Sequence, residues 1–108
     1  MLRVAIHSEN ASLRLSVQRA LLGAVSPNLY GACADLRDDL VVLTWYVAAF
    51  MPADEREDLQ AAATEVIADY PEGYDIDERF VEVADPSMPL RTTGAWTFLR
   101  RGFRTIDT

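Results

Sequence analysis

The segment over residues 40–50 limits most strongly what this chain can fold into. It reads LVVLTWYVAAF, and its β-branched and aromatic residues favour a strand. Successive side chains of a strand point to opposite faces, and here both faces are largely apolar, with Trp45 on one and Tyr46 on the other. Strands of this kind are covered on both sides. The sequence therefore predicts either a central strand or a strand whose second face meets a partner.

A shorter apolar segment, residues 29–35, precedes this strand. Residues 36–39 lie between the two and read LRDD, which is a polar turn. Two extended segments joined by so short a turn are typical of a β-hairpin. We therefore expect residues 29–35 and 40–50 to pair as neighbouring antiparallel strands.

Two segments carry the apolar spacing of a helix. In the first, residues 9–25, Leu13, Val17 and Leu21 recur every four residues, and Pro27 ends the pattern. The second begins after Pro52, which suits a first helical turn, and ends at Pro71. Its buried stripe consists of Leu59, Ala62, Ala63, Val66, Ile67 and Tyr70.

The remaining segments are extended or irregular. Residues 74–83 and 95–101 alternate in the manner of strands, and residues 85–89 contain two prolines and form a loop. Residues 2–7 also alternate, so we expect a short strand or an extended arm there; the alternative is a lead-in to the first helix. The ends of the chain, residues 1–8 and 104–108, are the parts that we expect to be loose.

The order of elements is (β)-α-β-β-α-β-β in a chain of 108 residues, which is the length of one domain. Antiparallel hairpins with helices on one face predict an α+β fold. We expect a two-layer sandwich: a mostly antiparallel sheet of about four strands, with two helices on one face. The single cysteine allows no internal disulfide, and no apolar run reaches the ~20 residues of a membrane helix. These features favour a cytoplasmic protein that does not enter a membrane.

The negative charge of the chain is concentrated in residues 54–85. This segment holds twelve carboxylates and two arginines, in a chain whose net charge is −7. Such a charge argues against nucleic-acid binding, which depends on basic side chains, and favours a basic protein partner. The carboxylates that we expect to contact this partner are Asp54, Glu55, Glu57, Asp58, Glu72, Asp75, Asp77 and Glu78.

No catalytic or metal-binding motif stands out. His7, the only histidine, has no set of further ligands around it, and Cys33 has no cationic neighbour that would make it a nucleophile. Asp75, Asp77 and Glu78 lack the ordered spacing and the glycine of a calcium loop. We therefore expect a buried structural cysteine, no cofactor, no metal and no enzymatic activity.

Three strings carry a resemblance to a known group of proteins. They are RALLGAVSPNL at residues 19–29, ATEVIADYPEGYDIDERFVEVADPSMPL at residues 63–90 and WTFLRRG at residues 96–102. With them the chain resembles small bacterial immunity proteins of the contact-dependent growth inhibition type. The resemblance implies a cytoplasmic protein that neutralises a cognate toxin domain, often a nuclease. A nuclease carries a basic cleft for its phosphate substrate, which an acidic inhibitor can occupy.

Two other functions compete with this one. The first is a self-associating structural or regulatory module, a homodimer that forms through the apolar strand at residues 40–50. The second is a small enzyme that uses Asp75, Asp77 and Glu78 in a pocket. A tight dimer without affinity for a basic partner would favour the first, and a deep pocket around the three carboxylates would favour the second.

Overall fold

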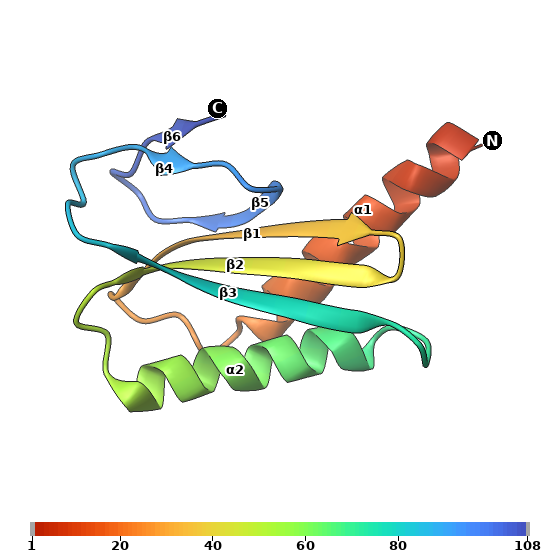
Figure 1. The fold of residues 1–108 in the computed structure, drawn as a ribbon, viewed down its shortest axis with the longest axis horizontal. Coiled ribbons are helices and arrows are strands. Elements are labelled where there is room, and N and C mark those ends of the chain that lie inside the picture. The colour runs from red at the N-terminus through yellow and green to blue at the C-terminus, as the bar shows by residue number, and fades with distance from the viewer. Residues whose placement is uncertain (1, 108) are drawn as a thin grey trace.

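A computed structural model describes residues 2–107 of the protein, with side chains from residue 11 onward. Its elements are α1 (Leu2–Ala20), β1 (Leu29–Arg37), β2 (Leu40–Ala48), α2 (Ala53–Ala68), β3 (Asp75–Val83), β4 (Leu90–Arg91), β5 (Ala95–Leu99) and β6 (Thr105–Ile106). Four strands form one sheet in the order β3-β2-β1-β5, and β4 pairs with β6 in a second, small sheet. In Figure 1, β1, β2 and β3 run side by side across the molecule. The predicted α+β fold, with two helices and a four-stranded sheet, is confirmed.

The main sheet is antiparallel except at one edge. β1 pairs antiparallel with β2, as the predicted hairpin, and with β5 on its other side. The hairpin turn places Asp38 at φ 55°, a left-handed conformation that aspartate tolerates. β3 pairs parallel with β2, because α2 carries the chain from the end of β2 back to the start of β3. This parallel strand forms the edge of the sheet, and it carries several of the carboxylates that the sequence singles out.

β2 is the central strand that its two apolar faces predict, since every residue from 41 to 48 is buried. One face packs against both helices, with α1 in contact with β1 and β5 and α2 in contact with β3. The main core includes Val41, Leu43, Trp45 and Val47 from β2 and Leu13, Val17, Leu59 and Val66 from the helices. Burying a side chain of this size contributes about 1.5–3 kcal/mol.

The second face of the sheet is covered by the C-terminal part of the chain. Tyr46 packs there with Cys33 and Leu90, and its hydroxyl donates a hydrogen bond to the carbonyl of Arg91. Burial raises the pKa of Tyr46 to about 12. Cys33 is buried, as predicted. Residues 41–48 are thus covered within one chain, so dimerisation through the two faces of β2 lacks an exposed surface; Phe50, beyond the end of β2, is 74% exposed.

Two stretches differ from the prediction. Residues 2–7 belong to α1, so the strand or extended arm expected there is wrong. No glycine or proline stands between residues 2 and 22, and each residue added to an existing helix gains a hydrogen bond. α1 also ends at Ala20, earlier than predicted, because i→i+3 bonds tighten the next turn and Gly23, at φ 83°, leads the chain away.

The C-terminal segment forms a contact that the sequence does not predict. β6 (Thr105–Ile106) pairs parallel with β4 (Leu90–Arg91), where we expected a loose end. The backbone N–H of Leu90 donates to the carbonyl of Arg104 at 2.8 Å. Two-residue strands are too short to carry a periodic pattern, so their pairing is set by the packing around them.

Candidate partner-binding surface

The eight predicted contact carboxylates fall into two groups. The first stands in the opening turns of α2, and the second spans the turn after α2 and the first half of β3. The first group is Asp54, Glu55, Glu57 and Asp58, and the second is Glu72, Asp75, Asp77 and Glu78. About ten helical residues, roughly 15 Å of α2, lie between Asp58 and the end of the helix, so Glu72 and Asp75 stand apart from the first group. The structure therefore does not bring the eight carboxylates into one compact patch.

Glu55, in the first group, is bonded inside the protein. Its Oε1 accepts a hydrogen bond from the Asn28 side chain at 2.9 Å and another from the Ser26 hydroxyl. These bonds, that from Ser26 first, hold the pKa of Glu55 below its ordinary value. Glu55 thereby ties the loop after α1 to the start of α2.

The other three carboxylates of the first group are exposed. Asp54 accepts a hydrogen bond from the backbone N–H of Glu55 at 3.0 Å, at a helix start where Pro52 supplies no side-chain cap. Glu57 and Asp58 make no hydrogen bond or ion pair with any described residue. Their location near the positive end of the helix dipole is favourable in itself. They also remain available to a partner.

The second group is divided between the two faces of the sheet. Asp77 lies opposite Val42, and Glu78 lies opposite Leu43, so the two side chains point to different faces. Asp75 shares the face of Asp77, away from the helices, whereas Glu78 is on the helix side. The three carboxylates therefore do not converge, and the enzymatic function that needs them in one pocket loses its basis.

Glu78 and Asp77 both have partners within the chain. The indole N–H of Trp45, a fully buried side chain, donates to Glu78 at 2.7 Å. Burial raises the pKa of Glu78, and the bond from Trp45 opposes that rise in part. Asp77 forms an ion pair of 2.6 Å with Arg79 on the same face of β3. Both carboxylates thus contribute to the structure of the sheet edge.

Glu72 and Asp75 are the exposed members of the second group. Their side chains, like those of Glu57 and Asp58, have no hydrogen bond or ion pair with the described residues. These four carboxylates are the ones that a basic partner can reach without breaking an internal contact. We call Glu57, Asp58, Glu72 and Asp75 the four free carboxylates.

Apolar side chains at the same edge were missed by the sequence reasoning. Val81 of β3 is 40% exposed, and Met88 in the following loop is 59% exposed. Together with Tyr46 and Leu90 they line a hollow of about 280 Å³ next to the end of β3. The adjacent apolar pair Phe80 and Val81 is the signal that could have revealed it, because it places one apolar side chain on each face of the strand.

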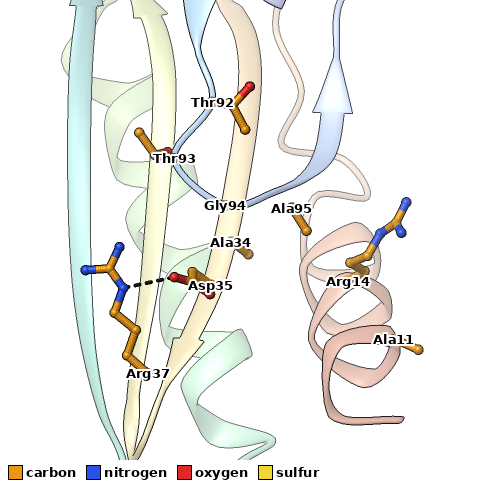
Figure 2. Close-up of a pocket in the computed structure, with 9 residues that line it drawn as sticks. All are labelled: Ala11, Arg14, Ala34, Asp35, Arg37, Thr92, Thr93, Gly94 and Ala95. Carbon is orange, nitrogen blue, oxygen red and sulfur yellow. Dashed lines mark hydrogen bonds and ion pairs between the residues drawn. The ribbon is translucent and has the colours of Figure 1, made fainter. Parts of the chain in front are cut away.

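A larger hollow, of about 770 Å³, lies elsewhere in the molecule, between α1, the end of β1 and residues 92–95. Figure 2 shows Arg14 on α1 at one side of it and the bonded pair Asp35 and Arg37 at the other. Its carboxylate, Asp35, is held by Arg37 at 2.9 Å. Among the side chains described, from residue 11 onward, Asp35 is the one carboxylate that lines this hollow, so they supply no pair of carboxylates for acid–base chemistry.

From residue 11 to residue 107, no three His, Cys, Asp or Glu side chains are grouped so as to hold a metal ion. The side chain of His7 lies outside the described residues. Between residues 2 and 107, neither helix combines the length and the apolar character that crossing a bilayer requires.

Exposed, unbonded carboxylates on α2 and at the start of β3, together with an apolar hollow at the end of β3, are features suited to binding another protein. The family model of MafI2 immunity proteins matches residues 10–102, and the chain belongs to this family. No match is found among the curated proteins. The predicted resemblance to a small bacterial immunity protein is confirmed, although the MafI2 family is named for a toxin system other than contact-dependent growth inhibition. An immunity protein has a cognate toxin as its partner, so a toxin is the class of partner that the family implies.

Proposed function

We propose that this protein binds a cognate toxin domain in the cytoplasm of the cell that makes both, and that it neutralises the toxin by occupying a basic surface on it. The observation that carries this proposal is the set of four free carboxylates, Glu57, Asp58, Glu72 and Asp75, which are exposed and have no partner among the described residues. Membership of an immunity protein family supports a binding function without catalysis.

Electrostatic attraction explains what the four free carboxylates would contribute. Exposed charges on a docking surface mainly raise the association rate, and their effect is screened by salt. A toxin that acts on nucleic acid has a basic cleft, and an acidic protein is drawn to that cleft. The carboxylates that are bonded within the chain, Glu55, Asp77 and Glu78, are expected to contribute less, because binding through them would break existing contacts.

The proposal is tested with a purified cognate toxin domain, sought first in the neighbouring reading frame. Two double variants, E57Q/D58N and E72Q/D75N, each remove two charges from one end of the surface. We expect either or both to slow association about tenfold at low salt and to flatten its salt dependence, since steering acts on the association rate. Stopped-flow or surface-based kinetics measure both effects at about 20 mM and about 500 mM salt, where the Debye length is roughly 20 Å and roughly 4 Å.

The control variant is E65Q/D107N, which removes the same number of exposed charges elsewhere. Glu65 borders Arg19 and Asp69 on the side of α2 that faces α1, away from β3. We expect the control to associate at the wild-type rate to within twofold. If all three variants associate alike, the four free carboxylates are not the docking surface. If the unaltered protein does not bind the toxin at all, the proposed function is wrong.

A further inference from the structure

β3 uses only one of its two hydrogen-bonding edges. All nine of its residues pair with β2, and β3 ends the sheet on that side. No backbone or side-chain hydrogen bond from the described residues reaches the backbone of residues 76–83 from the other side. Because alternate residues of a strand point their N–H and C=O groups to opposite edges, about four residues of β3 have these groups directed outward. An unpaired edge of this length is a template for an added strand.

The hollow beside β3 gives such an added strand a place for a side chain. It lies on the face of the sheet away from the helices, and Tyr46 and Leu90, both buried, form its inner wall. Val81 and Met88 remain exposed at its rim. When an extended segment adds to a sheet edge, main-chain bonds provide affinity and pockets for alternate side chains provide specificity. β3 combines both features.

The charge around this edge selects the kind of segment that can bind. Residues 72–85 contain six carboxylates and one arginine, Arg79, which is bonded to Asp77; Arg56 of α2 pairs with Glu82, and the other four carboxylates have no ion pair among the described residues. A second copy of this chain would place an equally acidic edge against the first, and like charges directly opposite one another destabilise a sheet. A basic segment would instead meet opposite charges on both sides of the strand.

We propose that a basic, extended segment of the cognate toxin adds to the free edge of β3 as a further strand of the sheet, with an apolar side chain in the hollow lined by Val81 and Met88. This inference rests on the proposed function and specifies how the partner is held. It differs from docking through side chains alone, because it requires new hydrogen bonds to the backbone of β3.

Amide hydrogen exchange measured by NMR tests this directly, with the unaltered protein and the same purified cognate toxin domain. In the free protein, the outward amides of β3 exchange faster than the inward ones that pair with β2. On binding, the outward amides should slow at least tenfold, so that protection extends to every residue of the strand. If the toxin binds while these amides exchange as in the free protein, the strand-addition proposal is overturned and the proposed function stands.

Two variants and a dilution series complete the test. V81S removes apolar surface from the rim of the hollow without adding a charge and should weaken toxin binding at least tenfold, whereas L22S, which alters another exposed apolar side chain two residues after α1, should change it less than twofold. Equal affinities for the two variants overturn the role of the hollow. If the outward amides become protected without toxin as the protein concentration rises, the edge pairs with a second copy, and the proposal is likewise overturned. If no toxin binding is detected, the proposed function fails and the inference with it.

Discussion

The hydrogen bond between Trp45 and Glu78 offers a quantitative test of how the edge strand is held. Trp45 is 0% exposed, and its indole N–H donates to Glu78 at 2.7 Å. Replacing Glu78 with alanine removes the acceptor, and a buried donor left without a partner costs about 1–3 kcal/mol. Because Glu78 itself is only partly buried, water can reach part of the vacated space. We therefore expect E78A to lower the free energy of unfolding by about 1.5 kcal/mol.

The variant E78Q separates the hydrogen bond from the charge. The side-chain carbonyl of glutamine still accepts a bond from Trp45, and the charge that burial disfavours is gone. We expect E78Q to be within about 0.5 kcal/mol of the wild-type protein at pH 7. The pKa of Glu78 is raised in the folded state, so its stabilising contribution is present below its ordinary pKa of 4.5 and is lost as the pH rises through the raised value. The wild-type protein should therefore gain stability relative to E78Q as the pH falls from 7 toward 4.5.

Urea unfolding followed by far-UV circular dichroism measures these differences. In a thermal melt, a loss of about 1.5 kcal/mol in the free energy of unfolding corresponds to a fall in Tm of roughly 6 °C for a domain of this size. E57A is the control, because Glu57 is exposed and unbonded among the described residues, and we expect it to change stability by less than about 0.5 kcal/mol. The reasoning is refuted if E78A unfolds at the same urea concentration as E57A, or if E78Q costs as much as E78A.

Two substitutions elsewhere test the packing around the site. E55Q should destabilise the protein at pH 7, because the carboxylate accepts bonds from Ser26 and Asn28. The pKa of Glu55 is lowered, so its contribution to stability is present above its ordinary pKa and is lost as the pH falls through the lowered value. The urea midpoints of E55Q and wild type should therefore converge between pH 7 and pH 3. A constant difference between the two midpoints would contradict this. G94A should lower the free energy of unfolding by about 2–3 kcal/mol, because the added Cβ would stand 2.6 Å from the carbonyl oxygen of Ala34. A thermal melt equal to that of the wild-type protein would disprove this close approach.

The helices and long strands follow closely from local patterns. The predicted strands at residues 29–35, 40–50, 74–83 and 95–101 correspond to β1, β2, β3 and β5, because period-two alternation is a property of neighbouring residues. The second helix begins after Pro52, as predicted, since proline fits the first turn. Residues 2–7 were mistaken for a strand because six alternating residues fit both periods, and only the helix that follows them decides between the two.

The arrangement of the strands depended on contacts between distant residues. β3 pairs parallel with β2 because α2 spans the length of the sheet between them, and a pattern read along β3 contains no sign of its direction. β4 and β6 pair across more than a dozen residues of chain, and neither is long enough to show a period. The hollow beside β3 likewise exists only because the loop that contains Met88 folds back beside Val81.

The sequence by itself determined that this chain forms an α+β domain with a central apolar strand and an acidic surface. The spacing of apolar residues and the number of charges can both be read from neighbouring residues and from composition. Only the tertiary structure decided which carboxylates are free. Glu55 bonds to Asn28, and Glu78 bonds to Trp45, across 27 and 33 residues of chain. A carboxylate that accepts such a bond helps to hold the fold together, whereas an equal charge two residues along the same helix from Glu55, that of Glu57, faces solvent. The difference arises because the availability of a charge depends on what the fold places beside it.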